Sequence, residues 1–537
     1  MNLLTSPFGA VGQAIARTIA YAKENGVNEI TLDRDTYHVY ANESAAPVVC
    51  VANHGYNGFK STAFAIEDME NLTIDCGGST FLLHGQMDFA IISRSKNITL
   101  KNAEIICLDT CNFQGKVIES SNECVKIALE KHAPLHLHGN FLTQKFFQEH
   151  MEVMRTLDYV TETRELRRGT GDNNFGAPIQ EIRKEMPDEN TICLYDVPVA
   201  PPVGDTIVFA MSRRCNQGVL VSHSENVLLE DITIRTCWGI GFIAQKCTDI
   251  TLRRCVVTPE DGNCWSAGQD ATHFVNCRGT VIIEDGVFEN QLDDAVNLHG
   301  IYTLVEKVAG DCVMMRYMHF QARGIDIYGV GDRIQIMDRE SQQPLAFATV
   351  AEVEVLNAEK TMLKLTDIEG EILPGMIAEN LSDECDAYIR NNVIRNNRAR
   401  GMLIAAKGHL EITGNHFHSG GSAIQFESDP IHWFECGGTV DVVIADNFFD
   451  DCRHGKWSRA VIDINKRKKT VDGFYYHDTI AVKNNRFTQT NVPCAACDNV
   501  KNFIFEGNEY AVEEPVKAAH AYVNGVRYDD SGAKVTE

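Results

Sequence analysis

The stretches Asn226-Val-Leu-Leu-Glu-Asp231 and Asp249-Ile-Thr-Leu-Arg-Arg254 carry the pattern that decides the fold. Each begins with Asn or Asp and continues with apolar and polar residues in alternation. The spacing from Asn226 to Asp249 is 23 positions, and that from Asn71 to Asn97 is 26. Short alternating strands at this period, separated by Asn and Gly, are typical of a parallel β-helix in which each repeat is one coil. Further copies of the pattern are Asn97-Ile-Thr-Leu-Lys-Asn102, Asp441-Val-Val-Ile-Ala-Asp-Asn447 and Asn502-Phe-Ile-Phe-Glu-Gly-Asn508.

The repeated asparagines fit the corners of such coils. Asparagine tolerates left-handed backbone angles, and its amide bonds to neighbouring backbone. Inward side chains of one coil would stack on those of the next coil, about 4.8 Å away. We therefore predict an all-β fold, a right-handed parallel β-helix, with a helix over residues 11–25 covering its first coil.

Two stretches lack the repeat, and we interpret both as inserted antiparallel β-rich modules. The first contains a helix-like segment from Leu142 to Met154 and a strand-like segment from Asp205 to Ala210. The second reads as antiparallel strands between Cys312 and Leu365, as in a small barrel. The expected division is a cap and first coils (1–120), the first insert (121–213), coils with an acidic cluster (214–304), the second insert (305–384) and C-terminal coils (385–537).

The bulk composition restricts the class of protein. The 537 residues carry a net charge of −25, which disfavours nucleic-acid partners and polyanionic substrates without a local basic patch. No apolar run approaches the roughly 20 residues that span a bilayer, so no membrane partner is expected. The first residues lack the features of a signal peptide, and the 18 cysteines are scattered. We therefore expect a cytoplasmic protein with free thiols.

The densest group of chemically active residues is an acidic cluster. Asp270 and Asp293 are 23 positions apart, about one coil, and Asp294 follows directly. Adjacent residues on a straight strand point to opposite faces, so Asp293 and Asp294 share a cleft only at a strand end or bulge. Three carboxyl groups this close cannot all ionise at little cost, so at least one pKa should rise.

A protonated carboxyl beside an ionised one is what a glycoside hydrolase needs, for its leaving oxygen and its water respectively. Asp270, Asp293 and Asp294 are therefore the predicted catalytic residues. The alternatives are a calcium site, which lacks the expected loop spacing here, and solvated turn acids. We expect no metal and no cofactor.

Residues suited to holding a sugar lie beside the acids and in a later segment. Aromatic rings stack on the apolar face of a sugar, and Arg, Glu and Asp bond its hydroxyl groups. The environment of His273 and His299 favours orienting a strand or a carboxylate over ligating a metal. The predicted substrate-binding residues are Trp265, His273, Asn297, His299, Arg398, Arg400, Glu427, Trp433 and Glu435.

Four stretches resemble glycoside hydrolase family 110. They are Gln269-Asp270-Ala-Thr-His-Phe-Val-Asn-Cys-Arg-Gly279, Glu289-Asn-Gln-Leu-Asp293-Asp294-Ala-Val-Asn297-Leu-His299-Gly300, Asn397-Arg-Ala-Arg-Gly-Met-Leu-Ile404 and Trp433-Phe-Glu435. The resemblance covers residues 214–300 and 385–450 well and is weak in the inserts. It implies an exo-acting α-1,3-galactosidase that inverts the anomeric configuration without a metal, cleaves linear or blood-group B oligosaccharides, and uses Asp270, Asp293 and Asp294 as its catalytic acids.

Two other classes remain open on the sequence. A polygalacturonase-like β-helix hydrolase would also use aspartates on neighbouring coils, but it needs basic residues for galacturonate. Arg278 is the only full cation between Asp261 and Gly300, which disfavours that class. A non-catalytic glycan-binding solenoid predicts stacking aromatics without a coupled acid cluster. Long flat solenoid faces make a homodimer a further expectation.

Overall fold

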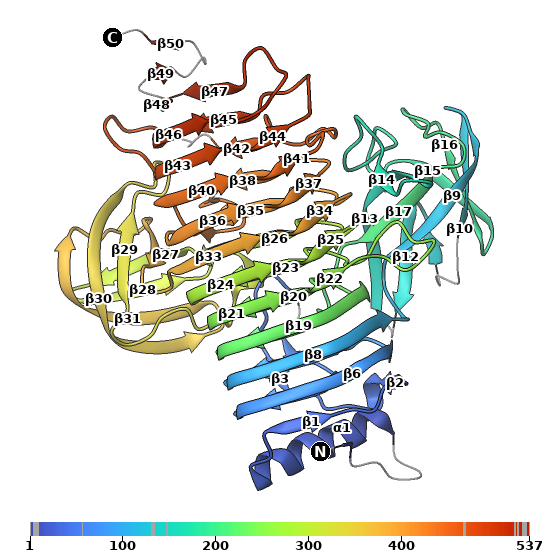
Figure 1. The fold of residues 1–537 in the computed structure, drawn as a ribbon, viewed down its shortest axis with the longest axis horizontal. Helices are drawn as coiled ribbons and strands as arrows, with labels where there is room; N and C mark the ends of the chain where they lie inside the picture. Colours follow the sequence, from blue (N-terminus) through green and yellow to red (C-terminus); the bar gives the residue numbers. More distant parts are fainter. Residues whose placement is uncertain are drawn as a thin grey trace.

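The computed structural model of the protein is an elongated solenoid with one module on each side (Figure 1). It describes all residues except 1, 4–9, 56, 130–134, 147–148, 466–468, 520–521, 524–525, 529–533 and 536–537. Successive coils add one strand to each of two long sheets, in which the solenoid strands pair in parallel. This confirms the predicted all-β, right-handed parallel β-helix.

One long sheet contains the repeats seen in the sequence. Its principal strands are β6 (Glu70–His84), β8 (Lys96–Cys107), β19 (Glu225–Thr236), β21 (Thr248–Arg253), β24 (Arg278–Glu284), β33 (Cys385–Arg390), β36 (His409–Thr413), β40 (Asp441–Ala445), β43 (His477–Lys483) and β46 (Val500–Glu506).

The other long sheet positions the acidic cluster. Its strands are β5 (Thr62–Glu67), β7 (Asp88–Ser93), β18 (Val219–Ser222), β20 (Phe242–Gln245), β23 (Thr272–Val275), β26 (Val296–Ile301), β35 (Met402–Ala405), β38 (Ile424–Phe426), β42 (Ile462–Ile464), β45 (Ala495–Asp498) and β47 (Val516–Ala519).

The asparagine repeats mark corners where the amides of successive coils bond to each other. Asn97 Nδ2 donates to Asn71 Oδ1 at 2.7 Å, and Asn226 Nδ2 donates to Asn97 Oδ1 at 2.8 Å. All three residues have φ between 52° and 56°, the left-handed region that asparagine tolerates. Asn226 and Asp249 flank residues that pair in register, Val227 with Ile250, so the spacing of 23 is one coil.

A second ladder of asparagines is buried inside the C-terminal half. Asn447 Oδ1 accepts hydrogen bonds from the backbone N–H and the amide of Asn415, while Asn447 Nδ2 donates to the carbonyl of Ile412. On the next coil, Asn485 Oδ1 accepts hydrogen bonds from the backbone N–H and the amide of Asn447. Each asparagine amide therefore pairs with backbone N–H and C=O groups of the coil below it. Burying those backbone groups without a partner would be costly.

Apolar side chains fill the solenoid from end to end. Phe417, Phe449 and Phe487 stack at the same position of three successive coils, with ring centroids 5.0 and 4.6 Å apart. The helix α1 (Val11–Asn25) covers the first coil with Ile15, Ile19 and Ala22, as predicted. The helix ends at Gly26, whose φ of 64° lies in the left-handed region and is incompatible with a further turn of right-handed helix.

The first module is an antiparallel sheet that includes β9 (Phe113–Ser120), β13 (Glu149–Val160) and β17 (Thr206–Met211). The helix expected between Leu142 and Met154 is wrong, because that stretch forms β12 (Phe141–Phe146) and the start of β13. Val153, Leu157 and Tyr159 are buried at alternating positions of β13, and pairing with β17 favours the strand over the local helical propensity.

The second module is a closed antiparallel barrel. Its strands are β27 (Thr303–Ala309), β28 (Cys312–Arg316), β29 (Arg333–Met337), β30 (Pro344–Asn357), β31 (Lys360–Gly370) and β32 (Ile377–Asn380). The barrel has a separate apolar core that includes Val313, Ile334 and Leu363. The antiparallel strands predicted in this stretch are confirmed.

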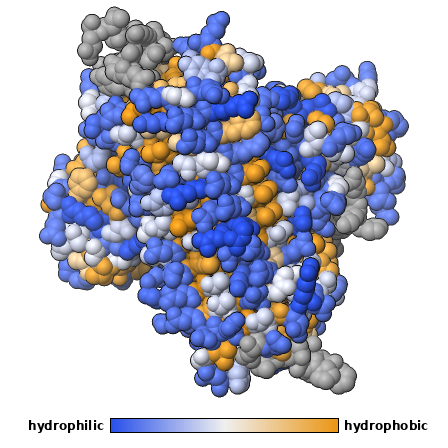
Figure 2. All heavy atoms as spheres, in the orientation of Figure 1, coloured by the Kyte–Doolittle hydropathy of each residue, from blue (hydrophilic) through white to orange (hydrophobic). Residues whose placement is uncertain are grey.

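Polar residues cover most of the face in Figure 2, with apolar residues in short stretches between them. Among the described residues, no helix is long and apolar enough to cross a membrane.

The buried ladder gives a test of the fold. Replacing Asn447 by Ala leaves the backbone N–H of Asn415 without its acceptor, so Asn447→Ala should lower the free energy of unfolding by about 2 kcal/mol. Urea denaturation measures this, with Asn190→Ala, at an exposed position, as the control. Equal midpoints for the two variants would contradict a stabilising role for the ladder.

Candidate active site

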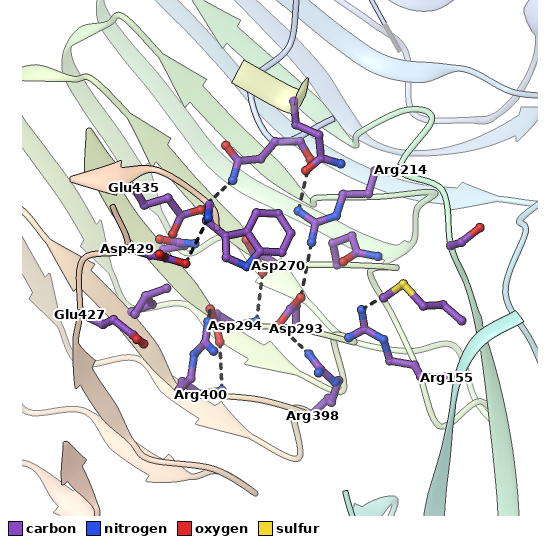
Figure 3. A pocket seen from close by; sticks show the side chains of 18 of the residues that line it. Arg155, Arg214, Asp270, Asp293, Asp294, Arg398, Arg400, Glu427, Asp429 and Glu435 are labelled. Carbon is purple, nitrogen blue, oxygen red and sulfur yellow. Dashed lines mark hydrogen bonds and ion pairs between the residues drawn. The ribbon is translucent and has the colours of Figure 1, made fainter. Parts of the chain in front are cut away.

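A cavity of about 550 Å³ lies at the edge of the sheet that contains β23, β26 and β35, between the two modules (Figure 3). Both modules contribute to its walls, the first through Met154 and Arg155 and the second through Phe320 and Gln321. The full lining is Asn53, Met154, Arg155, Ser212, Arg214, Gln269, Asp270, Asp293, Asp294, Asn297, Phe320, Gln321, Arg398, Arg400, Leu403, Glu427, Asp429, Trp433 and Glu435.

Three charged residues occupy the same corner of three successive coils. Thr272, Val296 and Met402 pair in register at the starts of β23, β26 and β35. Asp270, Asp294 and Arg400 each precede one of these residues by two positions, so they stack one above another. Asp270 is thus in register with Asp294, one position from the predicted coil spacing, and Asp293 is the neighbour that precedes this corner.

The corner lies just before the strands, where successive residues do not alternate strictly between faces. This allows Asp293 and Asp294 to line one cavity together, as the strand-end interpretation required. Single oxygens of Asp270, Asp293 and Asp294 all lie within 4.8 Å of one another. The predicted convergence of the three acids in one cavity is observed.

Each aspartate has different partners. Asp294 accepts hydrogen bonds from Arg400 Nη2 at 2.6 Å and from the Arg400 backbone N–H at 2.9 Å. Its own backbone N–H donates to Asp270 Oδ1 at 3.1 Å. Asp293 Oδ1 accepts from Arg398 Nη1 at 2.9 Å, and Arg214 Nη2 lies 3.7 Å from Asp293 Oδ2.

These surroundings separate the pKa of Asp293 from those of Asp270 and Asp294. Burial and the neighbouring charge of Asp293 raise the pKa of Asp270 to about 7. Burial, offset in part by Arg400, also raises the pKa of Asp294 to about 7. Burial acts on Asp293 in the same direction, but the charges of Arg398, Arg155, Arg214 and Arg400 outweigh it and lower the pKa to about 2. One permanently ionised group therefore lies beside two that hold protons near neutral pH.

The three carboxylates also have the proximity of a metal site, which the sequence left open as a calcium alternative. Calcium prefers six to eight oxygen ligands. Here Arg398 and Arg400 supply positive charge to Asp293 and Asp294 by direct contact. The contacts are those of an acid–base cluster with protein cations.

Six predicted substrate-binding residues line the cavity: Asn297, Arg398, Arg400, Glu427, Trp433 and Glu435. Trp433 is 42% exposed and offers a ring face, with His319 at 4.7 Å and the Arg214 guanidinium 5.4 Å from its centroid. Asn297 Oδ1 is buried without a hydrogen-bond partner.

The other three predicted residues do not line this cavity. Trp265 is only 4% exposed and packs with Tyr159 and Leu292, so stacking of Trp265 on a sugar in this cavity is a wrong prediction. His273 and His299 are buried behind Asp270, where His273 Nδ1 lies 2.6 Å from Asp270 Oδ2. His273 therefore contacts a catalytic candidate and His299 contacts His273, and neither lines the cavity.

Several lining residues escaped the sequence analysis. Arg155 and Arg214 lie in or beside the first module, where no repeat or motif identifies them, and Asn53 lies in a segment that crosses the sheet. Arg155 is buried, and its Nε has no hydrogen-bond partner. Asn53 Nδ2 donates to Glu435 Oε1 at 3.0 Å.

The cavity contains more cations than the sequence predicted. The absence of cations near Asp293 in the chain disfavoured an enzyme for acidic sugars, yet four arginines line the cavity. Six carboxyl groups line it as well, from Asp270, Asp293, Asp294, Glu427, Asp429 and Glu435. With Asp270 and Asp294 protonated, four carboxylates face the four arginines, so the cavity offers no excess of positive charge to an anionic substrate.

Fold and cavity together define the class: a parallel β-helix protein whose carboxyl cluster has the protonation states of a glycoside hydrolase site. The chain is 27% identical to the α-1,3-galactosidase A of Shewanella woodyi, over 92% of this chain and 82% of that protein. It is 28% identical to an α-1,3-galactosidase B of Bacteroides fragilis, over 95% and 89%. The α-1,3-galactosidase B of Akkermansia muciniphila is 26% identical over 94% of this chain and 65% of its own length. The chain is a homologue of these glycoside hydrolases, in agreement with the resemblance to family 110.

Residues 312–371 match the sequence profile of the GLAA-B beta-barrel domain II, within the observed barrel. Among solved structures, the A-module of the mannuronan C-5 epimerase AlgE4 of Azotobacter vinelandii is similar at a TM-score of 0.40 and 10% identity, over 97% of this chain and 98% of that chain. The family 28 exopolygalacturonase of Yersinia enterocolitica is similar at a TM-score of 0.37 and 11% identity, over 97% and 76%.

The raised pKa of Asp270 predicts how stability depends on pH. The folded protein keeps this proton up to about pH 7, whereas the unfolded chain releases it near the ordinary value of 3.8. The folded state therefore binds more protons between these values, and the contribution of Asp270 to stability falls as pH rises through this window. Asp270→Asn removes this dependence.

Relative to the unsubstituted protein, Asp270→Asn should gain about 1–2 kcal/mol in free energy of unfolding between pH 5 and pH 8. Denaturation at both pH values measures the change, with the exposed residue Asp261 replaced by Asn as the control. Parallel pH curves for Asp270→Asn and the unsubstituted protein would show that Asp270 ionises normally.

Proposed function

We propose that the protein is an exo-acting glycoside hydrolase that removes terminal α-1,3-linked galactose from oligosaccharides. The observation that carries the proposal is the stacked acid cluster of Asp270, Asp293 and Asp294 in a sugar-sized cavity, in a chain homologous to α-1,3-galactosidases. The trisaccharide of blood group B and linear galactosides are the proposed substrates. No step of the reaction is assigned to a metal or a cofactor.

The protonation states suggest a division of labour. Asp294, with a pKa of about 7 and a hydrogen bond to Arg400, is the proposed acid that protonates the leaving oxygen. Asp270 is the proposed base that takes a proton from the attacking water. Asp293, held ionised by its arginines, stabilises positive charge that develops on the sugar ring in the transition state.

Inversion at the anomeric carbon is part of the proposal, and it rests on the resemblance to family 110. Inverting enzymes usually separate the two carboxyl groups by about 6.5–9.5 Å, and retaining enzymes by about 5 Å. The closest oxygens of the three aspartates lie within 4.8 Å, which is nearer to the retaining separation. The cavity beside them has room for a water, so the product anomer is the decisive measurement.

A neutral sugar suits the lining better than an acidic one. Three of the four arginines already face Asp293 or Asp294, and carboxyl groups are in the majority. Trp433 can stack on the apolar face of galactose, and the unpartnered Arg155 Nε and Asn297 Oδ1 can bond its hydroxyl groups.

The first test offers the purified protein galactose-α-1,3-galactose, the blood-group B trisaccharide and polygalacturonate, with products followed by NMR. Galactose should be released and should appear first as the β-anomer. First appearance of the α-anomer would keep the hydrolase and replace inversion by retention. Cleavage of polygalacturonate alone would overturn the substrate.

Two substitutions test the acids. Asp293→Asn and Asp294→Asn should each lower turnover by about a thousandfold, because each removes a charge or a proton that the transition state requires. Circular dichroism should show an unchanged fold, and Asp285→Asn, at an exposed corner, is the control. Full turnover in either variant would remove that residue from the mechanism.

A reducing, cytoplasmic location and a homodimer belong to the same proposal. All 18 cysteines are free and fifteen of them are buried, which suits a compartment that keeps thiols reduced. The mass of the protein in solution tests the dimer.

A further inference from the structure

Three buried side chains form a continuous string behind the acid cluster. His273 Nδ1 lies 2.6 Å from Asp270 Oδ2, and His273 Nε2 lies 2.9 Å from His299 Nε2. His299 Nδ1 lies 2.7 Å from the carbonyl oxygen of Gly300. The histidine side chains are 0% and 1% exposed, so water does not complete these bonds.

The carbonyl of Gly300 fixes where the hydrogens lie. A carbonyl oxygen only accepts, so His299 Nδ1 carries a hydrogen, and in a neutral ring His299 Nε2 is then an acceptor. His273 Nε2 must therefore be the donor between the two rings. This leaves His273 Nδ1 as an acceptor, so Asp270 Oδ2 must carry a hydrogen. With both imidazoles neutral, the string is complete only when Asp270 is a carboxylic acid.

The same string can hold its proton at the other end. If the O–H bond of Asp270 breaks and an N–H forms at His273 Nδ1, the hydrogen on His273 Nε2 can pass to His299 Nε2. Asp270 is then a carboxylate and His299 an imidazolium, with every hydrogen bond of the string retained. Without the shared proton, two lone pairs would face each other at 2.6 or 2.9 Å.

The far end of the string is built to receive a positive charge. Glu435 Oε1 lies 3.6 Å from His299 Nε2 and accepts a hydrogen bond from Asn53. Burial opposes the ionisation of Glu435, but His299, His273, Asn53 and Arg400 outweigh it and lower its pKa. His299 also lines a second cavity of about 30 Å³, enough for a water.

Other charged and titratable groups face the string from each side. On the side of the large cavity these groups are Asp293, Asp294, Arg214 and Arg400. The segments that cover the string contribute His54 and Glu435. The second cavity is lined by Glu379, Asp383, Glu384 and Lys407. Burial and His299 lower the pKa of His273 well below its ordinary value. The shared proton therefore rests on Asp270 and not on His273.

We propose that Asp270, His273 and His299 share one proton, and that its transfer from Asp270 to His299 leaves Asp270 ionised to accept a proton from the attacking water. His273 and His299 are then positioning residues that act through Asp270. This inference rests on the proposed glycoside hydrolase function, and it assigns to the two histidines a task other than substrate binding.

The proton balance closes over one turnover. The water oxygen bonds to the anomeric carbon as the glycosidic bond breaks. The proton of the water goes to Asp270, and the leaving oxygen takes a proton from Asp294. The string then releases one proton to solvent and Asp294 takes one up, so the enzyme returns to its initial state.

The string predicts a change in pH dependence without a change in substrate affinity. In His273→Gln the route to His299 is broken, so Asp270 ionises only by losing its proton outward, with the pKa of about 7 that burial imposes. Below pH 7, kcat of this variant should fall about tenfold per pH unit relative to the unsubstituted enzyme, and recover to within about threefold at pH 8.5. KM should stay unchanged, because His273 does not line the cavity.

His299→Gln should give the same shift, and His477→Gln, a buried histidine of β43 away from the string, is the matched control with an unchanged profile. A proportional loss of kcat at every pH in His273→Gln, or a raised KM, would overturn the proposal. So would an unshifted acidic limb.

A measurement without substrate separates this proposal from the proposed function. Histidine-selective ¹⁵N NMR of the whole protein should show His299 protonated at Nδ1 and a far-downfield proton shared along the string. Asp270→Asn, whose amide can donate to His273 Nδ1 in place of the shared proton, should abolish that signal. A His299 ring protonated only at Nε2 would overturn the string. Detection of the shared proton in a protein that cleaves no galactoside would keep the string and discard the function.

Discussion

The register between successive coils is the constraint on which the rest of this protein depends. Backbone pairing places Thr272 beside Val296 and Val296 beside Met402. The residues two positions earlier must therefore lie at the same corner of their coils. Two aspartates and an arginine are thereby stacked at the spacing of neighbouring β-strands. Two ionised aspartates at this distance would repel each other, and the positive charge of Arg400 on the third coil reduces that repulsion.

The three carboxyl groups of the cluster differ in protonation because different charges surround them. Asp293 receives the charge of several arginines and stays ionised, while Asp270 and Asp294 are buried with fewer compensating charges and retain protons near neutral pH. The difference arises from position alone, since Asp293 and Asp294 are adjacent in the chain. Asp293 thus keeps its charge at a pH at which Asp270 and Asp294 still hold protons, so the cluster offers a carboxylate and a carboxylic acid together.

The coils of the solenoid supply one part of the site, and the two modules supply its side walls. The coils supply the acids, Arg398 and Arg400, and Arg155 comes from the antiparallel sheet (Figure 3). Phe320 comes from the connection between β28 and β29 of the barrel. A solenoid face is flat, and walls on both sides turn it into a cavity that can hold the end of a sugar chain. His273 and His299 are buried behind the acids, where their hydrogen bonds are isolated from bulk water.

The coil repeat, the corner asparagines, the helix α1 and the two β-rich interruptions could be predicted from the sequence, because these features depend on local periodicity and on backbone angles of single residues. The sequence also identified the acid trio, since one coil spacing brings Asp270 near Asp293 and Asp294. The side chains that surround the three acids could not be predicted in this way, because they come from distant parts of the chain. Arg398 meets Asp172 from 226 positions away and Asp293 from 105, and no local pattern encodes such contacts. For the same reason Trp265, which lies close to Asp270 in the chain, faces an apolar cluster, and β13, which begins in the segment from Leu142 to Met154, pairs with β17, which is distant in sequence.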